Sequence, residues 1–401
     1  MSSGGHEVEY DPFRFYDDPY PIYRQLRETA PLYRNAQRGL WVLSRYSDIQ
    51  AVARDWHTFI SGRGVDIDVE DFTYGPGDIL DMDPPRHDQL RRIMRAAFTP
   101  SGVRALEPLI TAKVDELLDT LIERGSGDFA REFAHRIPFT VICELWGIPK
   151  TDHALFEDWF VRLVEREPGE VAIQDDVWAA GEEMRVYIDD VLRMRRDRPG
   201  QDLLSTIGAA ITGGQMTLEE VVGMTRILLV AGIHTTETLI ANSLYLLAPL
   251  PDERRALADD PSRIPLAVEE LLRYESPVQW LARTTTADVE LHGQVIPAGE
   301  RIVLVWASAD RDDRQFANPD TLDLARSPNP HMAFGQGIHF CIGAPLARLE
   351  SRIAFTALFR RIPEYHVSGP IQRMFTRNER GISRLPVELT GVSARGRGRA
   401  S

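Results

Sequence analysis

Residues 334–343 read Phe-Gly-Gln-Gly-Ile-His-Phe-Cys-Ile-Gly, a glycine-rich loop with one cysteine near its end. Residues 344–350 directly after the loop have the pattern of a helix. Backbone amides at a helix N-terminus favour a thiolate, so Cys341 could be a nucleophile, a redox centre or a metal ligand. The glycines on both sides would let a large, flat group approach the backbone. The alternative is a glycine turn that carries a buried, inert thiol.

The pattern Phe-Gly-x-Gly-x-His-x-Cys-x-Gly resembles the haem-binding loop of the cytochrome P450 family, and every signature position matches. The resemblance implies a mainly α fold with a smaller β-rich region and a long central helix that crosses the haem. It implies haem b as cofactor, with Cys341 as the axial ligand of its iron. The cofactor-binding residues that it implies are Phe334, Gly335, His339, Cys341, Gly343, His87, Arg91 and Arg283.

Length and composition fit one large catalytic unit. At 401 residues the chain exceeds the size at which a single hydrophobic core usually stops growing, so one large fold or about two sub-domains are expected. With the family resemblance, we expect a single haem-thiolate unit over residues 1–401, with β-rich portions near 30–60 and 284–310. The basic tail at 395–401 is expected to be disordered.

Charge and cysteine content exclude several classes of function. A net charge of −14 argues against nucleic acid as a partner, because phosphate binding needs a basic surface. Two cysteines exclude a disulfide framework and a four-cysteine zinc site. No signal peptide is visible, and the most apolar window, 227–250, is interrupted by too many polar residues for a membrane span. We therefore expect a cytoplasmic protein without membrane attachment.

A helix is predicted from Thr217 to about residue 247. Thr217 and Glu220 form a capping box at its start, and at ~1.5 Å per residue the helix would span roughly 45 Å. Small residues and a pair of threonines interrupt its apolar pattern at 231–236. Without further context, this segment could simply be a locally bent helix whose threonine hydroxyls bond back to carbonyl groups.

The same segment is similar to the oxygen-binding helix of the family. The resemblance assigns Thr235 to donating a hydrogen bond toward dioxygen. His234 occupies a position where the family has an acid, and histidine can relay protons near neutral pH. His234 and Thr235 are therefore the catalytic candidates. The substrate-pocket candidates are Val230, Ala231, Val278, Leu281 and Ala282, together with the loop 65–80 and a turn near 380–383.

Two further pairs of residues have helical spacing. His87 and Arg91 are four residues apart and share a helix face, which the family uses to hold a haem propionate; a solvated basic face is the alternative. Glu270 and Arg273 are three residues apart and close enough to pair. The resemblance implies that they form a buried network on the haem side of the core.

The resemblance implies a monooxygenase that uses dioxygen to hydroxylate, epoxidise or dealkylate a hydrophobic small molecule. Electrons must come from outside, because the chain has no flavin or iron–sulfur motif; a ferredoxin and its reductase are the expected partners of a monomer. Four arginines form a candidate ferredoxin-docking patch: Arg92, Arg95, Arg348 and Arg352. Two alternatives stay open, a peroxygenase or isomerase, which the replaced acid at His234 would suit, and a non-catalytic haem-binding ligand sensor.

Overall fold

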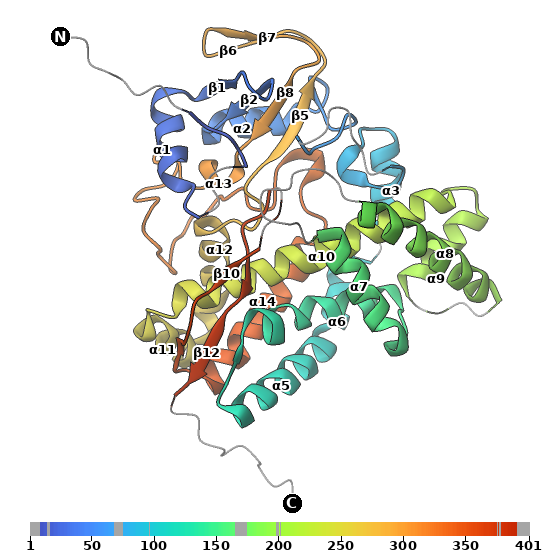
Figure 1. Cartoon of the computed structure of the whole chain (residues 1–401), viewed down its shortest axis with the longest axis vertical. Coiled ribbons are helices and arrows are strands. Elements are labelled where there is room, and N and C mark those ends of the chain that lie inside the picture. The colour runs from blue at the N-terminus through green and yellow to red at the C-terminus, as the bar shows by residue number, and fades with distance from the viewer. Residues whose placement is uncertain are drawn as a thin grey trace, which may run out of the picture.

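The computed structural model describes residues 9–13, 17–67, 75–95, 97–164, 175–197, 200, 202–374, 376 and 378–390. The predicted basic tail at 395–401 lies outside these residues. Helices make up most of the molecule, and the largest sheet lies to one side of them (Figure 1). The prediction of a mainly α fold with a smaller β-rich region is confirmed.

The helices follow one another along most of the chain. Those before the central helix are α1 Tyr20–Thr29, α2 Tyr46–Arg54, α3 Arg86–Arg95, α4 Pro100–Ala105, α5 Glu107–Arg124, α6 Arg136–Trp146, α7 His153–Val164, α8 Asp175–Asp197 and α9 Leu203–Thr212. The central helix and those after it are α10 Leu218–Leu247, α11 Pro251–Asp259, α12 Ile264–Tyr274, α13 Trp306–Ala309 and α14 Ala344–Arg361.

One predicted helix is divided in two. Its apolar positions predict a continuous helix from Val103 to Ile122, but the structure has α4 and α5 on either side of Leu106. Pro108 lies in the first turn of α5, where its missing amide is tolerated. Inside a continuous helix the same proline would remove a hydrogen bond and clash with the preceding turn. Gly125 ends α5 with a φ of 70°, as predicted.

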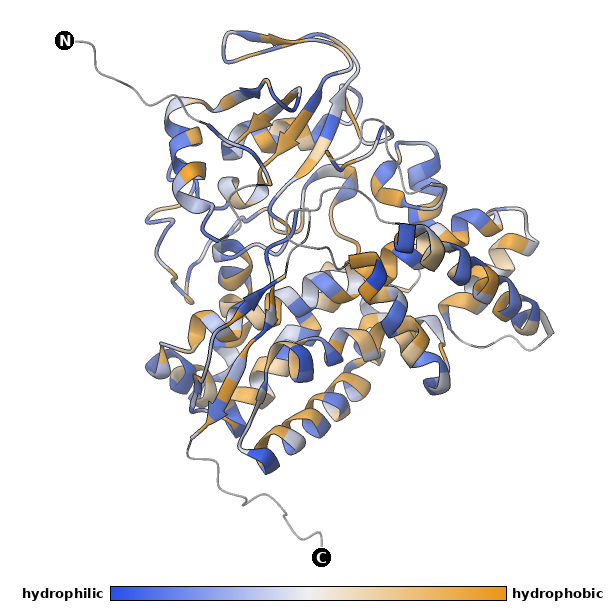
Figure 2. Cartoon of the chain, in the orientation of Figure 1, coloured by the Kyte–Doolittle hydropathy of each residue, from blue (hydrophilic) through white to orange (hydrophobic). Residues whose placement is uncertain are grey.

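The central helix α10 closely matches the prediction. Thr217 caps it, and the reciprocal bonds between Thr217 and Glu220 complete the capping box. It crosses the helical part of the molecule and packs against α6, α8 and α14 (Figure 1). Most of its side chains are buried and its ribbon is largely apolar in Figure 2. By length and composition alone α10 could cross a membrane, but the core helix of a folded protein passes the same test.

The strands form one larger sheet and three smaller ones. The larger sheet has the order β1-β2-β8-β5-β3, in which β2 and β8 are parallel and the other neighbours are antiparallel. Its strands are β1 Leu32–Asn35, β2 Leu40–Leu43, β3 Phe59–Ile60, β5 Leu281–Thr285 and β8 Arg301–Leu304. The smaller sheets contain β4 Ser126–Asp128, β12 Pro386–Leu389 and β9 Tyr365–Val367; β6 Val289–Leu291 and β7 Gln294–Ile296; and β10 Gln372–Arg373 and β11 Ile382–Arg384.

The second β-rich portion begins earlier than predicted. The expected boundary was residue 284, whereas β5 already begins at Leu281. Arg283 therefore lies within a strand, paired with Ile302 of β8, rather than before the sheet. Because side chains alternate along a strand, Leu281 and Arg283 share one face of β5 and Ala282 belongs to the other. This alternation decides which of these three side chains can face the site.

Candidate active site

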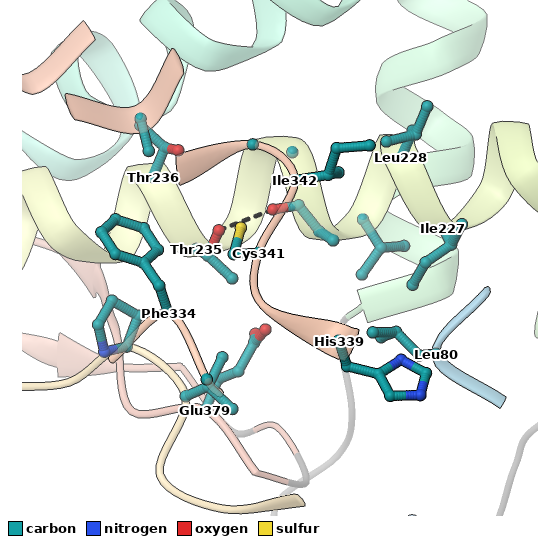
Figure 3. A pocket seen from close by; sticks show the side chains of 18 of the residues that line it. Leu80, Ile227, Leu228, Thr235, Thr236, Phe334, His339, Cys341, Ile342 and Glu379 are labelled. Atoms are coloured by element: carbon teal, nitrogen blue, oxygen red, sulfur yellow. Dashed lines mark hydrogen bonds between the residues drawn. The ribbon is translucent and has the colours of Figure 1, made fainter. Parts of the chain in front are cut away.

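The cysteine loop folds back on itself before α14 begins. The Cys341 amide donates to the carbonyl of Phe334 at 2.9 Å, which closes the loop. A 3₁₀ turn over Gly337–His339 lies inside it, and Gly343 is the N-cap residue of α14. The thiol of Cys341 is free and opens onto a cavity between this loop and α10 (Figure 3). The predicted combination of loop and helix N-terminus is therefore present.

Opposing effects act on the pKa of the Cys341 thiol. Burial raises the pKa of the Cys341 thiol above its usual value, because the thiolate is poorly solvated there. The amides of Gly343 and Ala344 and the charge of Arg91 lower it, as expected near a helix N-terminus, but burial outweighs them. Cys341 is nevertheless exposed to the cavity, and a bound metal ion there would favour loss of the thiol proton.

Two loop glycines are required by backbone geometry. Gly335 and Gly337 have φ angles of 68° and 71°, a region that other residues adopt only with strain. At Gly337 a β-carbon would also lie 2.3 Å from the carbonyl oxygen of Ala53 in α2. The absence of both side chains keeps the loop flat against α2.

Basic side chains from three separate segments meet beside the loop. The rings of His87 on α3 and His339 in the loop lie 4.5 Å apart between centroids. Arg91, one turn after His87, donates to the carbonyl of Phe340. Arg283 on β5 lines a small hollow with Gly335 and His339. Burial lowers the pKa of His339 well below its usual value, and the charges of Arg283, His87 and Arg91 lower it further.

Among the described residues an anion contacts one of these basic groups, since Asp88 lies 2.9 Å from Nδ1 of His87, and the others have no such partner. The Nε2 atom of His87 is buried without a hydrogen-bond partner. The buried guanidinium of Arg283 donates to the carbonyl of Ala282, and burial lowers its pKa to about 10. A flat cofactor with two carboxylates and an iron atom fits this arrangement, because it would pair the cations and meet the free thiol.

The cavity has a volume of about 330 Å³ and is lined mainly by apolar side chains. Four of the predicted substrate-pocket residues line it: Val230, Ala231, Val278 and Leu281. Ala282 does not, because it belongs to the other face of β5, where it is fully buried. The sequence did not predict other apolar residues that line the cavity, among them Met94, Phe98, Ile142 and Leu228. An apolar position in a helix indicates that the side chain is buried, but not whether it faces the core or a cavity.

Thr235 and Thr236 reach the cavity from α10, across from Cys341 (Figure 3). The Thr235 hydroxyl donates to the carbonyl of Ala231 at 2.7 Å, so its lone pairs stay available to another donor. This bond to a carbonyl of the same helix is the one expected from the alternative interpretation, a locally bent helix without a catalytic role. The same hydroxyl still lies at the cavity wall, where the catalytic interpretation needs it.

His234 does not line the cavity, contrary to its expected place on the substrate side. Its ring is fully buried, with Nε2 against the sulfur of Met374 and Nδ1 against a carboxylate oxygen of Glu379. Burial lowers the pKa of His234 to about 3, and the charge of His135 acts in the same direction. The contact with Glu379 acts in the opposite direction, because a carboxylate favours the charged ring, and Glu379 rather than His234 presents a polar group to the cavity.

Glu270 and Arg273 make the contact that their spacing predicts. Both are fully buried in α12, and two bonds of 2.8 Å join the guanidinium to the carboxylate. Arg326, Asn329 and the amide of Asp323 also donate to Glu270. Burial opposes ionisation, but these donors together lower the pKa of Glu270. The network connects α12 with the segment that leads into the cysteine loop.

Comparison with known proteins places the chain in a family. The family model described as "Cytochrome P450" matches residues 16–146 and 180–365. The chain is 40% identical over 395 residues to the vitamin D(3) 25-hydroxylase of Pseudonocardia autotrophica, covering 95% of this chain and 96% of the relative. It is 38% identical over 385 residues to the cytochrome P450 monooxygenase PikC of Streptomyces venezuelae, covering 93% and 91%.

Solved structures agree with this placement. CYP109E1 of Bacillus megaterium, crystallised with testosterone, matches with a TM-score of 0.86 and 31% identity, covering 95% of this chain and all of that one. A mutant of P450 EryK in complex with erythromycin B matches with a TM-score of 0.85 and 34% identity, covering 94% and 97%. With the cysteine loop, the central helix and these matches in agreement, the chain belongs to the cytochrome P450 family, whose members bind haem b.

Proposed function

We propose that the protein is a haem-thiolate monooxygenase that inserts one oxygen atom of dioxygen into a hydrophobic small molecule by hydroxylation, epoxidation or dealkylation. The observation that carries the proposal is the free thiol of Cys341, which faces the Thr235 side of α10 across an apolar cavity. Relatives named as a hydroxylase and a monooxygenase support the same reaction class. The whole chain would act as one catalytic unit.

The loop side would hold the cofactor. Cys341 would be the axial ligand, and Phe334, Gly335 and Gly343 would form the surface around it. His87, Arg91, Arg283 and His339 would bind the two propionates, whose negative charge would raise the pKa of His339 toward its usual range. The haem supplies activation of dioxygen, and the thiolate ligand favours cleavage of the O–O bond. Glu270 and Arg273 would act at a distance, by keeping the loop's approach segment in place.

Side chains of α10 would position protons at the other side of the cavity. The Thr235 hydroxyl would accept a hydrogen bond at the cavity wall while it donates to Ala231, and it would donate toward dioxygen only after giving up that bond. His234 would take part indirectly, through the contact of its Nδ1 with Glu379, because the ring itself does not reach the cavity. Apolar walls would exclude bulk water and so limit loss of protons and reductant to side reactions.

Electrons would come from a ferredoxin and its reductase. Arg92, Arg95 and Arg352 are exposed and Arg348 is partly exposed, which supports a basic docking surface beside the cysteine loop. Arg348 also pairs with Glu269 at 2.6 Å, so part of its charge is already compensated. We further propose a cytoplasmic monomer; the burial of most of α10 inside the fold supports a role for this helix as core rather than as membrane span.

Two measurements test the proposal. The reduced protein with carbon monoxide should show the absorption band of a thiolate-ligated haem, and Cys341→Ala should abolish it. The matched control is Cys143→Ala, since Cys143 is buried in α6 and should leave the band intact. With NAD(P)H, ferredoxin and reductase, the holoenzyme should then form oxygenated product from hydrophobic substrates. A missing band would contradict the haem assignment, and turnover only with peroxide would contradict the electron route.

A further inference from the structure

A second hollow, the arginine cleft, is separate from the cavity that Cys341 faces. It has a volume of about 360 Å³, and its walls come from α1, the C-terminal part of α10, the end of α12 and β10. Among the described residues, none lines both the arginine cleft and the Cys341 cavity. The side chains of this cleft therefore have no part in the roles proposed above for cofactor and substrate.

Alternation of side chains along the chain keeps the two spaces apart. Met374 places its sulfur against His234, whereas Arg373, the residue before it, lines the arginine cleft. In the same way Glu379 lines the Cys341 cavity, and Arg380 lines the arginine cleft. Because successive side chains of an extended chain point to opposite faces, these two segments form a wall between the two spaces.

Arginine side chains make up much of the polar wall of the cleft. The charged residues that line it in the described chain are four arginines and three carboxylates: Arg24, Arg311, Arg373 and Arg380, with Asp18, Glu275 and Asp320. Arg311 and Arg380 are only 4% and 6% exposed, so these charges are built into the fold and are not freely moving surface groups. A guanidinium keeps its charge in proteins, so the excess of one cation does not depend on pH.

Two of the carboxylates are already paired with three of the arginines. Glu275 forms an ion pair with Arg380. Asp320 forms ion pairs with Arg24 and with Arg311, the second at 3.1 Å. These pairs account for every arginine of the cleft except Arg373.

Arg373 is the cation without a partner. In the described chain its side chain forms no ion pair and no hydrogen bond. The third carboxylate, Asp18, is exposed at the rim and accepts the backbone amide of Tyr20 at 3.3 Å. Burial lowers the pKa of Arg373, and the charge of Arg380 lowers it further, so an anion beside it would be favourable. Glu275 acts in the opposite direction, but its carboxylate is paired with Arg380.

We propose that the arginine cleft is a binding site for a small organic carboxylate, which would accept hydrogen bonds from the guanidinium of Arg373. The planar fork of arginine suits a carboxylate, because two parallel hydrogen bonds can form. Tyr20, Tyr245 and Tyr274 line the same cleft and would contact the hydrocarbon part of the ligand. One excess positive charge suits a monoanion better than a phosphate that carries nearly two negative charges. The inference goes beyond the proposed function and does not depend on it.

The test compares benzoate with benzamide, a neutral molecule of the same shape, by calorimetry on the purified holoenzyme. The wild type should bind benzoate at least about tenfold more tightly, because the neutral amide cannot form the paired, charge-assisted hydrogen bonds. Equal affinities would overturn the inference without any variant. The visible spectrum of the haem is recorded at each addition and should not change. A preference for benzoate that appears only with a change in the spin state of the iron would place the carboxylate in the Cys341 cavity instead.

Arg373→Gln should bring the ratio of the two affinities close to one by weakening the binding of benzoate alone. The matched control is Arg384→Gln, which removes an exposed arginine of the neighbouring strand β11 that does not line the cleft, and it should keep the wild-type ratio. A preference that survives in Arg373→Gln would assign the carboxylate to another group. Inorganic phosphate is then added as a competitor: displacement of benzoate at a lower concentration than an added carboxylate needs would reassign the cleft to phosphate.

Discussion

Two buried acid–base pairs lie within the same helical core and are built differently. In α12, the Glu270 carboxylate accepts from two arginines, an asparagine and a backbone amide. At α10, the Glu379 carboxylate contacts His234 and faces a cavity. The first pair uses nearly all of its hydrogen-bonding capacity inside the protein, and the second has fewer partners and lies at the cavity wall.

This difference separates a structural role from a reactive one. Because nearly all hydrogen-bonding groups of the Glu270 network have partners, the network is fixed in one arrangement. Breaking it should reduce the stability of the fold. Glu379 has fewer partners, so its side chain is less constrained and a substitution there should change the stability of the fold less. Burial alone would not have distinguished the two, since Glu270, Arg273 and His234 are all fully buried.

The largest stability effect is expected at Arg273. Arg273→Ala should lower the free energy of unfolding by about 3–5 kcal/mol, because it leaves the Glu270 charge buried with fewer donors. The guanidinium also donates to the carbonyls of Asp310 and Pro319 at 2.8 Å, and both would lose a buried partner. Chemical denaturation of the holoenzyme measures the change.

Arg255→Ala is the matched control for that measurement. Arg255 pairs with Glu364 at 2.7 Å and with Asp252, but about half of its side chain is exposed. Exposed pairs contribute little, so the variant should unfold close to the wild type. If Arg273→Ala were no less stable than Arg255→Ala, the α12 network would not be the structural element that its bonding indicates.

A third cluster, also on α10, lies between these two extremes. His135 places Nδ1 2.8 Å from Glu237 of α10 and Nε2 2.9 Å from Glu157 of α7. Burial disfavours the charged ring, but the two carboxylates outweigh it and raise the pKa of His135 to about 9. The groups of this cluster contact one another within the protein, as those around Glu270 do. Its histidine nevertheless changes protonation in a pH range that can be measured.

Stability should therefore fall as pH rises through about 9. Because the folded-state pKa of His135 exceeds its unfolded value of about 6.5, its contribution is fully present below pH ~6.5 and is lost above pH ~9, at most about 3 kcal/mol. The free energy of unfolding of the holoenzyme at pH 6.5 and pH 10 gives the difference. His135→Gln should remove that pH dependence, and an unchanged slope in this variant would place the titrating group elsewhere.

Short sequence patterns predicted those features that lie within one helix or one loop. The cysteine loop, the capping box at Thr217 and the pairing of Glu270 with Arg273 depend on spacing of ten residues or fewer, and all are present. The contact between His234 and Glu379 joins residues 145 positions apart, and no pattern in either segment encodes it. Ala282 was misassigned for a related reason, since a shift of one residue in a strand reverses the face.

The smallest stability effect is expected at Thr235, where the change should instead alter the chemistry. Thr235→Ala removes one hydroxyl bonded to the carbonyl of Ala231 and should change the free energy of unfolding by only about 1 kcal/mol or less. The ratio of product formed to reductant consumed should nevertheless fall several-fold, because the cavity wall would lose the hydroxyl that positions a proton. Thr236→Ala, which removes the neighbouring hydroxyl at the same wall, is the matched control and should keep that ratio close to wild type. Equal ratios in all three proteins would show that the proton reaches the site by a route that does not use Thr235. Glu379, whose side chain also lines the cavity, would then be the next residue to vary.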